Sequence, residues 1–256
     1  MESKPPRHPA IRRRALVLGS AATALGLAAG IGIGFGLDDG SPGTAATPDV
    51  PAAAPAALVV PAHTTGKDGT VIPYGRAGAP VTLHVYEDLR CPYCGLFEQE
   101  LGGTVDSLVA SGRAKVEFHL AAFLDKRLGG KGSRTALGAL GAALNESPAL
   151  FKAYHSALYA AQPEDETTDT FGSTGKLLEI AGKVPGLRTP AFNKAVKEGT
   201  YLAWADKVAD AFYTSDVTGT PTVKVGDTPV AVIDDSGKAV GADRFTRQVD
   251  AAAAGR

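Results

Sequence analysis

The chain has 256 residues, of which 44% are hydrophobic, so it can form one medium-sized globular domain with extensions or two small domains. Its net charge of −1 gives no overall attraction to nucleic acid or anionic lipid, and no nucleic-acid partner is expected. Two cysteines are too few for a secreted scaffold held together by disulfides, so the domain must depend on a hydrophobic core.

The first predicted element is a membrane-spanning helix over residues 15–37, which contain no charged side chain. As a helix this segment is about 35 Å long, enough to cross a hydrocarbon core of about 30 Å. Residues 1–14 are basic and end in an arginine triplet at 12–14, whereas an aspartate pair follows at 38–39. The positive-inside tendency therefore predicts that residues 1–14 are cytoplasmic and that everything after residue 37 is outside.

Two alternatives to this uncleaved anchor stay open. The first is a cleaved signal peptide. The segment is longer than the hydrophobic region of a typical signal peptide, which has only about 7–15 residues. Its interior is rich in Ala and Gly, however, and this composition weakens it as a membrane anchor. The arginine triplet also fits a twin-arginine signal. In each case the following domain is extracytoplasmic, as a single-pass membrane protein or, after cleavage, as a secreted one.

Residues 38–69 are rich in Ala, Pro, Gly and Thr, which predicts an extended linker. The prolines interrupt helices, and the segment has too few large apolar side chains to form a hydrophobic core. The folded domain is predicted over residues 70–256. Its strands are expected at 70–74, 81–86, 115–120, 222–225 and 230–233. Its helices are expected at 94–110, 133–145, 148–161, 174–181, 190–198, 201–213 and 243–253.

The central motif is Cys91-Pro92-Tyr93-Cys94, which lies between a predicted strand and a predicted helix. Residues three apart share one face of a helix, so the two sulfurs can come within bonding distance. The unpaired N–H groups and the dipole of a helix start favour an anion, which lowers the pKa of the Cys91 thiol. Cys91 is therefore predicted to be the exposed nucleophile, and Cys94 the shielded thiol that attacks a mixed disulfide.

Other interpretations of the cysteine pair are weaker. A structural zinc site usually needs a second cysteine pair or two histidines, and His84 and His119 fall in predicted strands, where a histidine is usually a packed residue. A structural disulfide across so short a loop would add little stability. No metal and no cofactor is expected.

A second motif is the run at 217–223, which places Thr220-Pro221 just before a predicted strand. A proline in this position is a candidate cis peptide. The Thr220 backbone would then be available to pair with an extended peptide, so Thr220 and Pro221 are the predicted substrate-binding residues.

The segment at 85–98, VYEDLRCPYCGLFE, resembles the active-site segment of the DsbA-like thioredoxin superfamily, especially its membrane-anchored actinobacterial members. The segment at 218–222, TGTPT, resembles the cis-proline loop of that family. The resemblance covers about residues 70–255. It implies an α/β thioredoxin-like fold with a helical insertion at about 122–215.

The resemblance also assigns roles. Cys91 would be the attacking cysteine, Cys94 the resolving one, and Pro221 a cis proline facing the disulfide. Glu98 matches a helix glutamate that tunes proton transfer, with a solvated surface glutamate as the alternative. The sequence departs from well-known members in the dipeptide Pro92-Tyr93, which replaces Pro-His, and in Thr220, which replaces Val; both departures leave the redox potential open.

Two further carboxylates, Glu87 and Asp88, precede the cysteine motif. They are candidates for raising the Cys91 pKa or for moving protons, with simple exposure to solvent as the alternative. Trp204 and the apolar helices of the insertion are expected to be core.

The predicted function is an extracytoplasmic thiol–disulfide oxidoreductase, foremost an oxidase that introduces disulfides into secreted proteins. The resemblance implies a membrane partner of the DsbB or VKOR type that reoxidises it. Two alternatives stay open: a reductase for cytochrome or copper-site assembly, and a non-catalytic peptide-binding adaptor. The redox potential separates the first two, and the intact cysteine pair disfavours the third.

Overall fold

The structure is a computed structural model that describes residues 57–255. The predicted cytoplasmic segment 1–14 and the predicted membrane helix 15–37 lie outside the described residues. Within residues 57–255, none of the helices combines the length and the apolar character needed to cross a membrane.

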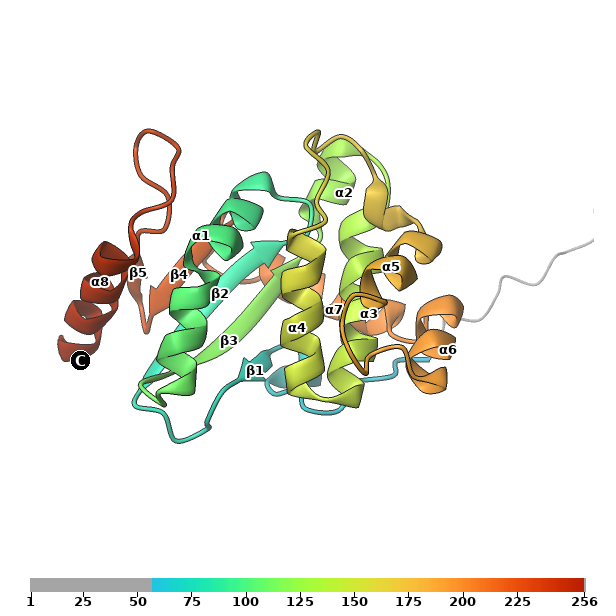
Figure 1. The fold of residues 1–256 in the computed structure, drawn as a ribbon, viewed down its shortest axis with the longest axis horizontal. Helices are drawn as coiled ribbons and strands as arrows, with labels where there is room; N and C mark the ends of the chain where they lie inside the picture. The colour runs from blue at the N-terminus through green and yellow to red at the C-terminus, as the bar shows by residue number, and fades with distance from the viewer. Residues whose placement is uncertain (1–56, 256) are drawn as a thin grey trace, which may run out of the picture. The chain divides into compact units, whose positions relative to one another are not determined.

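A five-stranded mixed sheet forms the centre of the domain, with the strand order β1-β3-β2-β4-β5. Strands β2 and β3 run parallel, and the other three pairs are antiparallel. The strands are β1 (Ile72–Tyr74), β2 (Val81–Asp88), β3 (Ala114–Ala121), β4 (Thr222–Val225) and β5 (Thr228–Val230). The parallel pair requires a crossover, which helix α1 (Pro92–Ala110) supplies, as the sequence predicted (Figure 1).

Six helices lie between β3 and β4, in the segment where the resemblance implies a helical insertion. They are α2 (Phe123–Leu128), α3 (Gly132–Glu146), α4 (Pro148–Tyr159), α5 (Thr174–Ala181), α6 (Pro190–Glu198) and α7 (Leu202–Tyr213). Helices α4, α5 and α6 are capped by Ser147, Ser173 and Thr189, whose hydroxyls accept a backbone N–H of the first turn. A last helix, α8 (Ala242–Ala254), follows β5.

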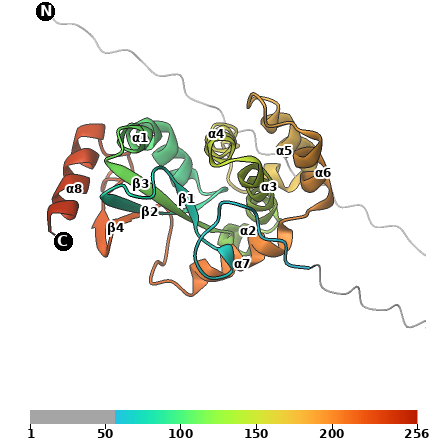
Figure 2. The same ribbon diagram turned by 90° about the horizontal axis from the view of Figure 1, so that it is seen from below.

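The two faces of the sheet differ in composition. Alternate residues of β2 and β3, including Leu83, Val85, Val116 and Phe118, are buried in the main core. The intervening residues are mostly polar and partly exposed. Figure 2 shows α1 and α7 on opposite sides of the sheet. Helix α7 covers part of the polar face through Phe212, whose ring meets Tyr86 edge-on.

Three details of the fold differ from the sequence prediction. Helix α2 was not predicted, because its six residues are too few to show a clear period. Strand β5 lies at Thr228–Val230 rather than 230–233. Residues at the end of the predicted linker contact the domain, since the Trp204 indole donates to the Gly69 carbonyl over 2.8 Å. Trp204 itself is fully buried, as expected.

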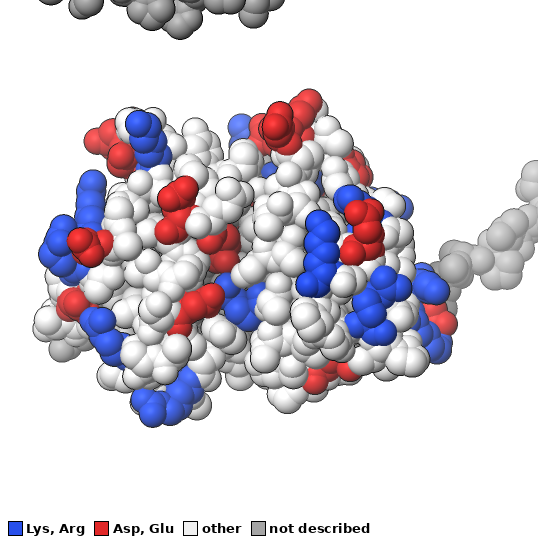
Figure 3. All heavy atoms as spheres, in the orientation of Figure 1, with Lys and Arg blue, Asp and Glu red and all other residues white. Residues whose placement is uncertain are grey.

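The surface in Figure 3 carries mixed charge. Basic and acidic side chains are interspersed over this face, and no continuous basic field covers it. Extended basic patches are the usual mark of nucleic-acid binding. The face drawn in Figure 3 is therefore consistent with the net charge of −1.

Candidate active site

The cysteine motif lies where β2 passes into α1. Cys91 is the residue that caps α1, with extended backbone angles, and Pro92 occupies the first turn, where its missing N–H is no loss. The backbone N–H groups of Cys94 and Gly95 both donate to the Cys91 carbonyl over 3.1 Å. Neither cysteine forms a disulfide in this structure, which therefore represents the dithiol form.

The two thiols have different environments. Cys91 is 6% exposed and Cys94 is fully buried, so Cys91 is the more accessible thiol but is less exposed than the sequence predicted. A hydrogen bond from the Cys94 thiol is the main cause that lowers the pKa of Cys91 to about 7, against the opposing effect of burial. Burial and the neighbouring Cys91 sulfur raise the pKa of Cys94 well above its ordinary value. The thiolate thus forms on Cys91.

The second sequence motif lies against the first. The Thr220–Pro221 peptide bond is cis, as predicted. The Thr220 carbonyl accepts a hydrogen bond from the Cys91 thiol over 3.4 Å, and the Thr220 side chain helps to lower the Cys91 pKa. A pocket of about 540 Å³ opens beside this contact, lined by Tyr93, Thr220, Pro221 and residues 233–237. Tyr93 is half exposed at its rim.

Behind the cysteines lies a buried cluster of four charged side chains: Glu87 of β2, Glu98 of α1, and Lys152 and His155 of α4. His155 Nε2 lies 2.9 Å from Glu87 Oε2, and His155 Nδ1 lies 3.6 Å from Glu98 Oε2. Lys152 Nζ lies 3.3 Å from the same Glu98 oxygen. No side chain of the four is more than 6% exposed. The solvated alternatives for Glu87 and Glu98 are therefore wrong.

The cluster changes the acidity of each member. Burial raises the pKa of Glu87 to about 7, against the effect of His155. Burial opposes the charge of His155, but Glu87 and Glu98 outweigh it and raise the pKa of that imidazole to about 9. Burial likewise opposes the charge of Glu98, but His155 and Lys152 outweigh it and lower its pKa. Glu87 thus titrates near neutral pH.

Glu87 connects this cluster to the cysteine pair. After burial and the Cys91 sulfur, the negative charge of Glu87 is a further cause that raises the pKa of the Cys94 thiol. A carboxylate that titrates near neutral pH, and whose charge acts on a buried thiol, is a candidate to exchange a proton with that thiol. Sequence reasoning named Glu98 and missed His155 and Lys152, because an amphipathic helix pattern does not show which charges meet inside the core.

Other buried groups hold the loop between β2 and α1. Gln162 Nε2 donates to the carbonyls of Leu89 and Cys91 over 2.7 and 3.1 Å. The Asp88 carboxylate accepts the Ser133 hydroxyl over 2.5 Å and the Leu124 N–H over 3.1 Å. Asp88 is therefore buried, not exposed, and burial raises its pKa to about 6.

The structure brings together most of the residues selected from the sequence. Cys91, Cys94, Tyr93, Thr220 and Pro221 meet at one site, with Pro92 in the helix turn between the cysteines. Glu98 is part of the buried cluster and is linked to Glu87 through His155. Glu87, Glu98 and His155 also form a possible ligand set for a metal ion. Their full burial and the contact from Lys152 fit an ion-pair cluster better.

Comparisons with known proteins agree with this geometry. The thioredoxin family model matches residues 67–251. A curated relative, Disulfide bond formation protein D of Bacillus subtilis, is 25% identical over 154 residues, which are 60% of this chain and 66% of that protein. The chain spans from 30% to 66% of the lengths of the curated relatives that it matches.

Among the solved structures that share the fold, two illustrate the likeness. Oxidised BdbD from Bacillus subtilis has a TM-score of 0.60 at 22% identity, covering 75% of this chain and 97% of that one. Oxidised DsbA of Mycobacterium tuberculosis has a TM-score of 0.57 at 24% identity, covering 76% and 91%. These likenesses and the family match confirm the expected α/β fold with its helical insertion. The chain belongs to the thioredoxin family, and its fold is that of the DsbA-like members.

Proposed function

We propose that this chain is a thiol–disulfide oxidoreductase, and that it acts as an oxidase which introduces disulfides into secreted proteins. The observation that carries the proposal is the pairing of a Cys91 thiol of lowered pKa with a fully buried Cys94 beside the cis-proline loop. The name of the relative from Bacillus subtilis, a disulfide bond formation protein, supports the same assignment.

The oxidase reaction begins with a disulfide between Cys91 and Cys94. A substrate thiolate attacks the Cys91 sulfur, the Cys91–Cys94 bond breaks, and its electron pair leaves on the Cys94 sulfur, which takes up a proton. A second substrate thiolate then attacks the substrate sulfur of the mixed disulfide and releases Cys91 as a thiolate. The substrate loses two electrons and two protons, and the enzyme becomes a dithiol.

The surrounding residues support these steps. Glu87, whose charge acts on Cys94, is the group we assign to exchange this proton, either directly or through a water, since its pKa of about 7 allows both states near neutral pH. The Thr220 backbone and the adjacent pocket hold an extended substrate segment against Cys91. Stabilisation of the Cys91 thiolate favours the reduced enzyme, which makes the disulfide a better oxidant.

A reductase is the second candidate, and one observation favours it. The Cys91 pKa of about 7 is close to that of thioredoxin, a reducing member of the superfamily. Such an enzyme would keep a thiol reduced during cytochrome or copper-site assembly. The direction depends on the reduction potential of the pair relative to its surroundings.

An assay with a dithiol peptide tests the proposed activity. The purified full chain, oxidised and kept in mild detergent, should convert one equivalent of a dithiol peptide to its disulfide while its own pair becomes reduced. Cys91→Ser should abolish the reaction. A chain that neither oxidises the dithiol peptide nor reduces its disulfide form would support the non-catalytic peptide-binding adaptor instead.

The proposal includes a location and a partner. Residues 15–37 would anchor the chain in the cell membrane, with residues 38–69 as the linker and the domain from residue 70 outside. A quinone-linked membrane enzyme of the DsbB or VKOR type would reoxidise it. Protease added to intact cells should remove the domain; protection until lysis would contradict the topology and the oxidase role together.

A further inference from the structure

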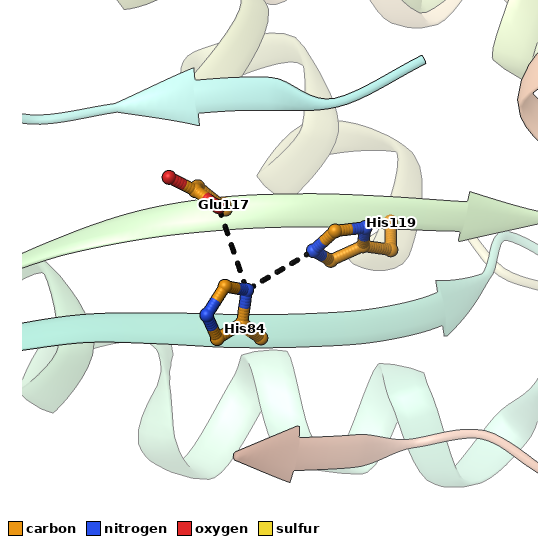
Figure 4. Close-up of side chains that lie close together, drawn as sticks. All are labelled: His84, Glu117 and His119. Atoms are coloured by element: carbon orange, nitrogen blue, oxygen red, sulfur yellow. Dashed lines mark hydrogen bonds and ion pairs between the residues drawn. The ribbon is translucent and has the colours of Figure 1, made fainter. Parts of the chain in front are cut away.

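A second cluster of chemically active side chains lies on the polar face of the sheet, away from the cysteine motif. Figure 4 shows His84 on β2 facing Glu117 and His119 on β3. His84 is the register partner of Glu117, and His119 is two residues further along β3, so all three side chains stand on one face. The parallel register thus joins residues that are far apart in the sequence.

The distances within this cluster match a metal site. His84 Nδ1 lies 3.2 Å from His119 Nε2 and 3.5 Å from Glu117 Oε2, and the three ligand atoms all lie within 4.8 Å of one another. In a tetrahedral zinc site with bonds of about 2.0–2.1 Å, neighbouring ligand atoms are about 3.3 Å apart. An ion could therefore join the three groups with little movement of the strands.

The side chains around the cluster hold it in place. The His119 ring stacks on Tyr86, with ring centroids 4.5 Å apart and planes 13° from parallel. Tyr86 in turn contacts Phe212 of α7. Because two paired strands carry the three ligands and one ring is stacked, the geometry is set before an ion arrives.

The cluster is also accessible. The side chains of His84 and Glu117 are 27% and 22% exposed, so the cluster is open to solvent on one side. Lys115 Nζ binds Glu117 Oε1 over 2.8 Å, which leaves Oε2, the oxygen nearer His84, for the ion. Water can fill the remaining coordination positions, as it does in zinc sites with three protein ligands.

We propose that His84, Glu117 and His119 bind a zinc ion. Two imidazole nitrogens and one carboxylate oxygen form a ligand set typical of zinc, whereas calcium and magnesium prefer oxygen ligands throughout. This site is separate from the cysteine pair and does not depend on the proposed oxidoreductase activity. The bound ion would tie β2 to β3 at the centre of the sheet.

The test must keep zinc away from the cysteines, which bind it as thiolates. The full chain is therefore first oxidised to the Cys91–Cys94 disulfide and then titrated calorimetrically with zinc chloride. We expect one equivalent to bind and the thermal unfolding midpoint to rise with the zinc concentration. Cobalt in place of zinc should give the visible absorption of a low-coordinate site.

Matched variants locate the ion. Glu117→Gln and His119→Gln should each weaken zinc binding by about tenfold or more, and Glu164→Gln, which removes an exposed carboxylate elsewhere, should leave it unchanged. Lys115→Met should strengthen zinc binding, because it removes a positive charge beside the site. This variant keeps all three ligands, so it tests the site even if the ligand variants fold poorly. Zinc binding that none of the cluster variants changes, or no binding to the oxidised chain, would overturn the proposal.

Discussion

His155 Nε2 and Glu87 Oε2 lie 2.9 Å apart, and both side chains are fully buried. The pair connects α4 of the helical insertion to the end of β2, four residues before Cys91. The insertion therefore also supplies two buried cations, His155 and Lys152 of α4, which oppose the effect of burial on the pKa values of Glu87 and Glu98. This arrangement has consequences for stability and for reactivity.

The first prediction concerns His155. Replacing it by Gln leaves Glu87 and Glu98 buried without that cation, which should reduce the free energy of unfolding by about 3–5 kcal/mol near pH 7. Buried carboxylates without this partner have raised pKa values, so the stability of the variant should be greatest at low pH and fall as the pH rises. Urea unfolding near pH 4 and pH 7 measures the difference from the wild type.

The wild type should lose less stability between pH 4 and pH 7, although its own Glu87 pKa of about 7 also makes its stability fall as the pH rises over this interval. Its His155 pKa of about 9 exceeds the ordinary value of 6.5, so the stability linked to His155 is complete below pH 6.5 and lost as the pH rises through 9. His63→Asn, which changes an exposed histidine, is the control and should follow the wild type. An equal loss of stability in His155→Gln at pH 4 and pH 7 would contradict the electrostatic account.

The second prediction concerns the acidity of Cys91. Alkylation of the reduced protein should modify Cys91 first, and the rate should rise with pH around a midpoint near 7, as the thiolate forms. Cys94→Ala removes the hydrogen bond that lowers this pKa most, so the midpoint should move upward. Peptide mapping identifies the modified residue; preferential labelling of Cys94 would be inconsistent with the assignment.

The third prediction concerns Gln162, a positioning residue for the active-site loop. Gln162→Ala removes the donor to the Leu89 and Cys91 carbonyls, which should lower the free energy of unfolding by about 1–3 kcal/mol and slow disulfide exchange. Gln99→Ala on the exposed face of α1 is the matched control and should change neither. Gly95→Ala should resemble Gln162→Ala, because its Cβ would lie 2.0 Å from Gln162 Oε1. Unchanged stability and kinetics in Gln162→Ala would remove its positioning role.

The sequence predicted most of this fold because its signals are local. The β-branched run that forms β2 (Val81–Asp88), the cysteine motif and the capped helices all carry short-range patterns. The sequence placed strand β5 too late in the chain, because Pro229 lies inside the strand and a proline normally argues against a strand. This proline is tolerated because β5 is at the edge of the sheet.

The rest of the site depends on long-range contacts. Nothing near His155 in the sequence indicates that it will meet Glu87, 68 residues away. His84 and His119 were interpreted as packed strand residues, because only the register of β2 against β3 brings them together. Both clusters, the buried one around His155 and the partly exposed one around His84, depend on tertiary structure, so a single sequence does not reveal them.

The fourth prediction is that Cys94→Ala traps substrates. A substrate disulfide exchanges with Cys91 to form a mixed disulfide, and without Cys94 that bond has no internal route of escape. Complexes should survive on non-reducing gels and disappear with reductant. Trapping of many secreted proteins would indicate a general oxidase. Trapping of only one or two cytochrome-assembly or copper-assembly proteins would indicate a dedicated reductase. An absence of trapped complexes in cells would count against exchange chemistry.

The same gels test the groove beside Cys91. The Thr220 carbonyl already accepts a hydrogen bond from the Cys91 thiol, and Pro221 lines the adjoining pocket. Replacing Pro221 should therefore alter the lifetime of the mixed disulfides even when both cysteines are present. Unaltered lifetimes would place substrate binding elsewhere.

The equilibrium between the Cys91–Cys94 pair and glutathione tests the central proposal most directly. The fraction of oxidised protein, read from the mass of alkylated samples across a series of glutathione ratios, gives the reduction potential of the pair. The oxidase proposal predicts a potential between about −180 and −120 mV, the range of protein disulfide isomerase and DsbA. A potential at or below about −270 mV, that of thioredoxin, would contradict the oxidase and identify a reductase.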